Sequence, residues 1–147
     1  MFEKWKSRRL QNESNGEPPL TVLAMTASGP DATRLHDILA GPAWKLRVVD
    51  NLEDAQAFLG ARSPSIVLFD RDLPNVDWRQ AIGKLANGHC RVILASFVAD
   101  DYLWEEVIHC GGYDVIAKPF RADEVIHMIQ FAWAAITKSL PSAPRTK

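Results

Sequence analysis

Three residues of chemically active types each follow a run of apolar residues. Asp70 follows the letters IVLF, Ser96 follows VILA and Lys118 follows VIA. A carboxylate can attack phosphorus, a hydroxyl can donate a hydrogen bond to a phosphoryl oxygen, and an ammonium can offset the negative charge. If the fold brings these three side chains together, they can accept and hold a phosphoryl group.

The apolar runs predict the strands that would carry these residues. Five runs have strand character: Leu20–Met25, Lys45–Val49, Ser65–Asp70, Arg91–Ser96 and Tyr113–Ala117. The first, third and fourth are continuously apolar, which is typical of strands buried on both faces in a parallel sheet. The second alternates apolar and charged residues and therefore favours an edge of the sheet.

Amphipathic segments between these runs carry helix start signals. The residues predicted to cap the first four helices are Ser28 or Asp31, then Asn51, Asp77 and Asp100. A fifth helix is predicted from about Ala122 to Thr137. Strands alternating with helices predict a doubly wound α/β sandwich with a five-stranded parallel sheet, in which ligands bind at the edge where the strands end.

Length, charge and composition limit the domain organisation, the kinds of partner and the location of the protein. A chain of 147 residues with 47% hydrophobic residues suits one globular domain, which we place at 20–138, between an extension and linker at 1–19 and a flexible tail at 139–147. The net charge of −1 argues against direct nucleic-acid binding, and the longest apolar run, six residues, is too short to span a membrane. The two cysteines and the lack of a secretory signal favour the cytoplasm.

The segment that begins at Asp70 reads DRDLPNVD and resembles the acceptor segment D-x-x-L-P-G-x-D-G of response-regulator receiver domains. Ser96 lies 22 residues before the Lys118–Pro119 pair and Gly111 lies seven before it, as in that family. The resemblance spans about Leu20 to Thr137. It implies a flavodoxin-like (βα)5 fold with strand order 2-1-3-4-5. It also implies Asp70 as phosphoacceptor, Ser96 as switch hydroxyl, Lys118 as the family's lysine, and a cis peptide bond before Pro119.

The sequence departs from this family where Mg²⁺ would bind. In the family the first strand ends in two or three acidic residues, whereas here it ends in the letters AMTAS. Mg²⁺ prefers oxygen ligands and usually needs one or two carboxylates. Asp70 and Asp72 remain as candidate metal ligands, so the expected Mg²⁺ site is weak or absent. Trp78 and Val115 also replace the family's usual glycine and aromatic residue, which puts the standard switching mechanism in doubt.

These observations favour a stand-alone, non-enzymatic receiver that takes a phosphoryl group on Asp70 from a histidine kinase or phosphotransfer protein. It would signal by contact with a downstream protein. The alternative is a pseudo-receiver, a protein-binding module that never carries phosphate, in which Asp70 is a helix cap or a structural ion-pair partner of Lys118. An enzyme or small-molecule binder on this scaffold has little support, because no glycine-rich loop follows the first strand.

The last predicted helix is apolar in nearly every direction, which indicates that more than the sheet must cover it. Pairing with a second copy through this helix would do so, because a two-fold axis lets one patch cover itself. The N-terminal segment, with Phe2 and Trp5, is the competing cover.

Overall fold

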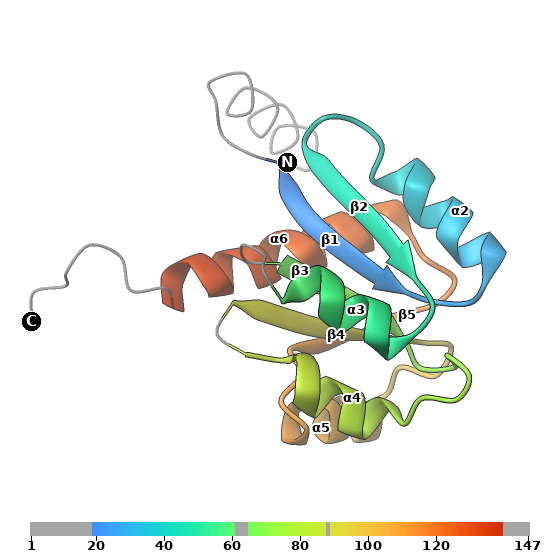
Figure 1. Ribbon diagram of the computed structural model, residues 1–147, viewed down its shortest axis with the longest axis vertical. Coiled ribbons are helices and arrows are strands. Elements are labelled where there is room, and N and C mark those ends of the chain that lie inside the picture. Colours follow the sequence, from blue (N-terminus) through green and yellow to red (C-terminus); the bar gives the residue numbers. More distant parts are fainter. Residues whose placement is uncertain (1–18, 61–64, 88, 140–147) are drawn as a thin grey trace, which may run out of the picture.

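Strands and helices alternate along the part of the chain that the computed structural model describes, which comprises residues 19–60, 65–87 and 89–139 (Figure 1). The strands are β1 (Leu20–Met25), β2 (Trp44–Val49), β3 (Ser65–Asp70), β4 (Cys90–Ser96) and β5 (Asp114–Ala117). The helices are α2 (Gly29–Ile38), α3 (Leu52–Leu59), α4 (Trp78–Leu85), α5 (Asp101–His109) and α6 (Ala122–Ser139). The predicted bounds of the five strands and of α6 differ from the observed ones by two residues at most.

The strands form a five-stranded sheet in the order β2-β1-β3-β4-β5, and every neighbouring pair is parallel. The fold predicted from the sequence, including β2 at an edge, is therefore confirmed. Asp70 pairs with Ala95, and Ser96 pairs with Ala117. This register brings the carboxyl ends of β3, β4 and β5 to the same end of the sheet. That end is called the rim below.

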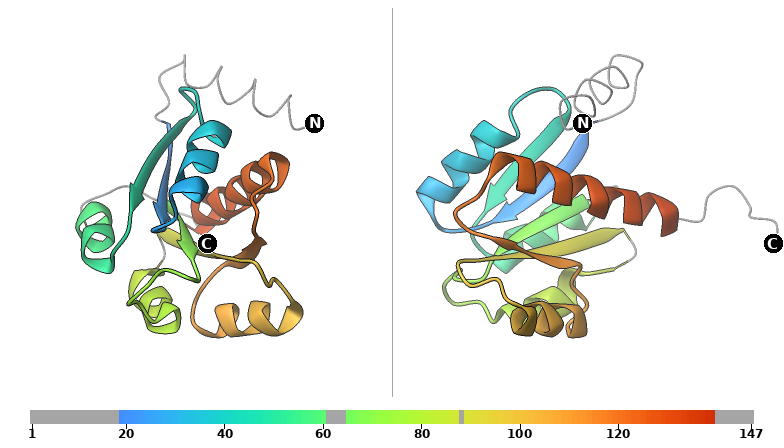
Figure 2. Two further views of the ribbon diagram at one scale, coloured as in Figure 1. Left: turned by 90° about the vertical axis from the view of Figure 1, so that its right-hand side faces the viewer. Right: turned by 180° about the vertical axis from the view of Figure 1, so that it is seen from behind.

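Helices cover the sheet on both faces. On one face α2 and α6 pack on alternate residues of the inner strands, with Leu35, Ile126 and Ile129 in the core. On the other face α3, α4 and α5 pack on the remaining residues, with Phe58, Ile82 and Val107 in the core. Figure 2 shows α2 beside α6 on one side, with α3 and α4 on the other. Strands buried from both sides explain why their sequences are continuously apolar.

Side-chain caps begin four of the helices as the sequence predicts. Asn51, Asp77 and Asp100 each accept a hydrogen bond from a backbone amide in the first turn of α3, α4 and α5. For α2, the cap is Ser28, whose hydroxyl accepts from the amide of Asp31 at 3.2 Å. The carboxylate of Asp31 is therefore not used as the cap.

Helix α6 is better covered than its sequence predicts. It contacts β3, β4, β5 and α2, so two of its sides lie against the domain. Phe131 is its one large hydrophobic side chain exposed by more than a third, at 64%, within residues 122–136, and Met128 and Trp133 are partly buried against the core. More apolar surface is exposed on and before α5, at Phe97, Val98, Tyr102, Trp104 and Ile108.

The described residues bear only in part on two further expectations, the terminal segments and the membrane span. The predicted extension and tail lie outside them, apart from residues 19 and 139. Within the described residues, no helix has the length and apolar character needed to span a membrane.

Candidate functional site

Asp70 lies at the rim as the last residue of β3, and its side chain is nearly buried. Its Oδ1 atom accepts hydrogen bonds from Lys118 Nζ at 3.0 Å and from the backbone amide of Asp72 at 2.9 Å. Its Oδ2 atom accepts from the hydroxyl of Thr26 at 2.9 Å. These three donors hold the carboxylate in one orientation.

Lys118 follows β5 and reaches Asp70 across the end of β4. Its ammonium donates to Asp31 Oδ2 at 2.9 Å as well as to Asp70, and it lies 4.6 Å from the centre of the Phe97 ring. Burial by itself lowers the pKa of Lys118. The hydrogen bonds to Asp31 and Asp70 and the charges of both carboxylates outweigh burial, so its pKa lies above the ordinary value. Lys118 is therefore a fixed positive charge at neutral pH, and its peptide bond to Pro119 is cis, as the resemblance implies.

Ser96 lies at the same rim between the other two residues, but it makes different contacts. Its hydroxyl oxygen accepts from the amide of Val98 at 3.1 Å and, more weakly, from Arg71 Nη1 at 3.5 Å. No hydrogen bond joins its side chain to Asp70 or Lys118 among the described residues. The structure thus brings Asp70 and Lys118 into direct contact and places Ser96 beside them.

The end of β1 carries no acidic residue, as the sequence indicates. Thr26 takes a place at the rim next to Asp70, and its hydroxyl also accepts a hydrogen bond from the amide of Ser28 at 3.0 Å. Asp72 is exposed, and its contribution to Asp70 comes from its backbone amide. Among the described residues no group of three or more His, Cys, Asp or Glu side chains is placed to hold a metal ion. The residues present do not fit the acid-rich Mg²⁺ site of the receiver family.

Sequence reasoning missed three residues of the site. Asp31 appeared as one of two alternative helix caps, Thr26 as the place of a lost acid, and Phe97 not at all. The contact between Asp31 and Lys118 joins residues 87 positions apart, which no local pattern reveals. A usable signal did exist: a first-turn residue of α2 must lie near the rim, because α2 begins directly after β1 ends there.

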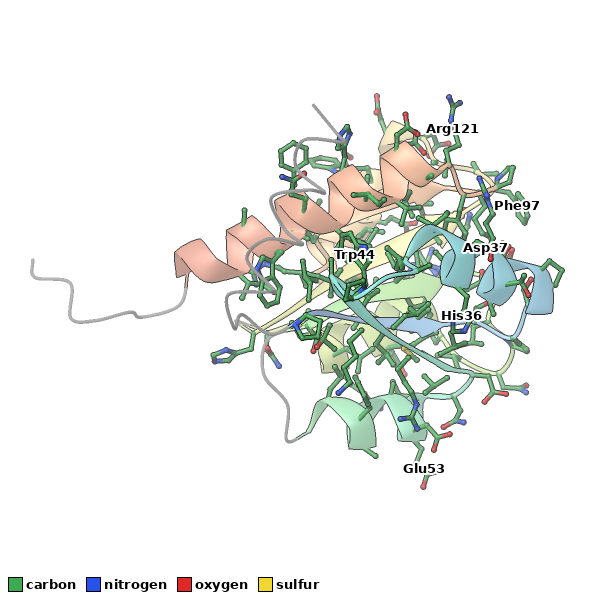
Figure 3. All side chains as sticks on the ribbon, turned by 90° about the horizontal axis from the view of Figure 1, so that it is seen from above. His36, Asp37, Trp44, Glu53, Phe97 and Arg121 are labelled. Atoms are coloured by element: carbon green, nitrogen blue, oxygen red, sulfur yellow. The ribbon has the colours of Figure 1, made fainter. Side chains whose placement is uncertain are left out.

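Figure 3 shows Phe97 at the end of the molecule where the strands end and α2 begins. Phe97 is 65% exposed, yet its ring lies against the buried ammonium of Lys118. An aromatic ring face attracts a cation through its quadrupole. The ring therefore lies against the Lys118 ammonium without adding an opposite charge.

The comparison with known protein families agrees with this arrangement. Residues 29–130 match the response regulator receiver domain family, and the chain belongs to that family. Receiver domains are in general signalling modules of two-component systems rather than enzymes.

Among curated proteins, the chain is similar to the regulatory protein AtoC of Escherichia coli, with 32% identity over 71 residues. It is also similar to the chemotaxis protein CheY of Bacillus subtilis, with 30% identity over 69 residues. These matches use 47% and 46% of this chain and cover 15% of AtoC and 58% of CheY. The chain thus matches less than two thirds of the length of either relative.

Solved receiver structures share the fold at low sequence identity. A signal receiver domain of an HD domain-containing protein from Pseudomonas fluorescens has a TM-score of 0.75 at 18% identity, over 86% of this chain and 96% of that one. The chemotaxis response regulator CheY4 of Vibrio cholerae has a TM-score of 0.69 at 13% identity, over 77% and 98% of the two chains. At these identities the likeness shows the fold alone.

Proposed function

We propose that this receiver accepts a phosphoryl group on Asp70 from the phosphohistidine of a histidine kinase or phosphotransfer protein, and that it signals by contact with a downstream protein. The observation that carries the proposal is the 3.0 Å contact between Asp70 and Lys118 at the rim. A carboxylate nucleophile held beside a fixed ammonium is the pair that phosphoryl transfer to a carboxylate needs.

The neighbouring groups support the same chemistry. The Asp72 amide and the Thr26 hydroxyl orient the nucleophile, as described above. Ser96 lies on the strand between Asp70 and Lys118, and its hydroxyl can rotate to donate to a phosphoryl oxygen. Arg71 lies within 3.5 Å of that hydroxyl and adds a second positive charge near the rim.

We propose further that Mg²⁺ binding, with Asp70 and Asp72 as the available carboxylates, is weak or absent. The support is the acid-free end of β1, where Thr26 offers a hydroxyl whose hydrogen is already donated to Asp70. We also propose that two copies of the chain can pair through α6.

Intact mass after incubation with acetyl phosphate and Mg²⁺ tests the phosphoacceptor. We expect a slow gain of one phosphoryl group that Asp70→Asn abolishes. Asp77→Asn is the matched control, because it makes the same change in the same segment and Asn still caps α4. A full gain in the Asp70→Asn variant, or no gain in the unmodified chain even with a phosphorylated kinase, would sink the proposal.

The alternative is a pseudo-receiver that binds partners and never carries phosphate. One observation favours it: Asp70 and Lys118 already form a nearly buried ion pair, and Asp31 pairs with the same ammonium. Such a network can be purely structural. The absence of any mass gain in the experiment above would select this function.

A further inference from the structure

The Lys118 ammonium is held from three directions. Asp70 Oδ1 and Asp31 Oδ2 accept from it at 3.0 and 2.9 Å, and the Phe97 ring lies 4.6 Å away. The lysine side chain is only 3% exposed. An ammonium carries three N–H donors, and two of them are engaged by carboxylates, so its position is fixed. The chain therefore supplies a cation of its own, the Lys118 ammonium, at a fixed position in the site.

The oxygens of Asp70 leave little room for another cation. A carboxylate oxygen has two lone-pair positions. On Oδ1 both positions accept hydrogen bonds, from Lys118 and from the Asp72 amide. On Oδ2 the Thr26 hydroxyl occupies one position, and no second donor reaches it from the described residues. That second position of Oδ2 is the one available for bond formation.

Asp31 explains how the lysine keeps its place. Its carboxylate stands in the first turn of α2, and its backbone amide is fixed by the Ser28 cap. A rigid helix end thus holds one side of the ammonium while Asp70 holds the other. When Asp70 reacts, Lys118 must exchange its hydrogen bond to Asp70 for one to a phosphoryl oxygen. The contact with Asp31 can then keep the ammonium at the rim.

We infer that Lys118, positioned by Asp31, supplies the positive charge of this site in place of a divalent cation, so that Asp70 takes up a phosphoryl group without metal. This inference rests on the proposed phosphoacceptor function. Asp31 is accordingly a positioning residue, because it acts on phosphorus through Lys118. Since Thr26 donates a hydrogen bond where the receiver family offers a metal-binding acid, the metal's usual ligand set is missing and Lys118 remains the nearest cation.

Every bond that forms or breaks in the transfer step can be assigned without a metal. Oδ2 of Asp70 forms the new O–P bond with its free lone pair. The P–O bond to the acetyl group of acetyl phosphate breaks, and acetate leaves with the electron pair. With a phosphohistidine donor, the P–N bond breaks and the electron pair returns to the imidazole nitrogen. The ammonium of Lys118 offsets the charge on the phosphoryl oxygens throughout.

The rate of phosphorylation with and without metal tests the inference. The full chain is stripped with EDTA, and its mass gain from acetyl phosphate is followed in EDTA and in Mg²⁺ at equal ionic strength. We expect rate constants that agree within about twofold, since the cation that matters is part of the chain. A rate about tenfold or more lower in EDTA would overturn the inference, because a metal would then supply the charge.

The role of Asp31 is tested with Asp31→Asn and, as matched control, Asp37→Asn. Asp37 is exposed on the same helix, so the control removes the same charge from α2 (Figure 3). We expect Asp31→Asn to slow phosphorylation in EDTA about tenfold, because the Lys118 ammonium has lost one of the two carboxylates that position it. Asp37→Asn should leave the rate unchanged, and Asp31→Glu should recover part of it. Equal rates for the two Asn variants would overturn the role of Asp31.

A spectroscopic readout separates positioning from folding. An ammonium held by two carboxylates exchanges its hydrogens slowly, so its ¹H–¹⁵N signal is visible by NMR. We expect that signal for Lys118 in the unmodified chain and in Asp37→Asn, and its loss in Asp31→Asn with the rest of the amide spectrum retained. A Lys118 signal that is missing from the unmodified chain would contradict the fixed ammonium.

The two proposals fail in different ways. A mass gain that needs Mg²⁺ leaves Asp70 as phosphoacceptor and overturns the metal-free mechanism. No mass gain in either buffer overturns both, even where the NMR signal shows that Asp31 holds Lys118.

Discussion

The Asp70 carboxylate accepts hydrogen bonds from three different kinds of donor: a hydroxyl, an ammonium and a backbone amide. The carboxylate and the ammonium are both nearly buried, so each depends on its partner. Removing one member of a buried pair leaves an uncompensated charge, which costs more than the pair contributes in net stability. The site is thus a stability element as well as a candidate reaction centre.

Lys118→Met should for this reason destabilise the fold. It leaves the carboxylates of Asp70 and Asp31 without their shared cation, and we expect a loss of about 3–5 kcal/mol in the free energy of unfolding. Urea unfolding measures this loss. Adding Asp70→Asn to Lys118→Met should restore part of it, because a neutral amide replaces the stranded charge. An unchanged free energy in Lys118→Met would show that water already solvates this pair.

Mg²⁺ affinity follows from the acid-free end of β1. We expect the unmodified chain to bind Mg²⁺ at least about tenfold more weakly than the double variant Thr26→Asp with Ala27→Asp, a difference of about 1.4 kcal/mol or more. Calorimetric or fluorescence titration compares the two. Equal affinities would mean that Asp72 or another group already completes a metal site.

Stability at high pH depends on Cys90, which is buried in the core. Burial raises its pKa to about 11 from an ordinary value of 9.0, although Arg91 opposes the shift. Between these values the unfolded chain loses the thiol proton while the folded chain keeps it, so stability falls as pH rises. We expect Cys90→Ala to remove on the order of 2 kcal/mol of that decline in urea unfolding across this interval. Cys110→Ala is the control, and an equal effect there would contradict the assignment.

Lys118 acts in the same direction at still higher pH. Its folded-state pKa is raised, so its contribution to stability is complete at neutral pH and is lost as pH rises through that value. Both groups therefore lower the free energy of unfolding as pH rises into the alkaline range.

Among the helices and strands, the sequence predicts most of the observed arrangement. Buried strands such as β3 are identified because both of their faces are apolar, and helix starts because Asn51, Asp77 and Asp100 are good caps. The choice between Ser28 and Asp31 needed the structure. Both residue types cap helices well, and the contact that decides between them, Asp31 with Lys118, is formed between distant parts of the chain.

The candidate site was predicted less completely for the same reason. Asp70, Ser96 and Lys118 could be placed at one rim because the first two end a strand and Lys118 directly follows one. The orientation of Ser96 toward Val98, and the positions of Thr26 and Phe97, depend on side-chain packing that residue spacing does not encode.

Two glycines near α5 should respond to alanine with opposite signs. Gly111 follows α5 with a φ of 100°, where a side chain is strained, so Gly111→Ala should destabilise by about 1 kcal/mol. Gly83 lies within α4, and an added methyl group meets nothing closer than 3.9 Å. Gly83→Ala should stabilise by up to about 1 kcal/mol, because alanine favours helix. Thermal unfolding compares the two, and the same sign for both would contradict this account.

For the molecule as a whole, self-association remains a prediction. Helix α6 offers Phe131 as its large exposed hydrophobic side chain within residues 122–136. If copies pair through α6, Phe131→Glu should convert dimer to monomer in sedimentation, because the charge would lie on the two-fold axis or near it. Tyr102→Glu, on α5, is the matched control and should leave that dimer intact. A monomeric unmodified chain would show that the prediction from the α6 sequence was wrong.

The parallel pairing of every strand also has a kinetic consequence. Parallel neighbours cannot be joined by a tight turn, so each pairing must wait until a crossover segment has closed. The Thr26–Asp70 and Asp31–Lys118 contacts join residues 44 and 87 positions apart, and the second needs β5 in place at the far edge of the sheet. A partly folded chain without β5 lacks the lysine and leaves Asp70 and Asp31 to repel each other. If Asp70 is the phosphoacceptor, phosphoryl uptake would begin only after the last strand docks, so the proposed function would require completed folding.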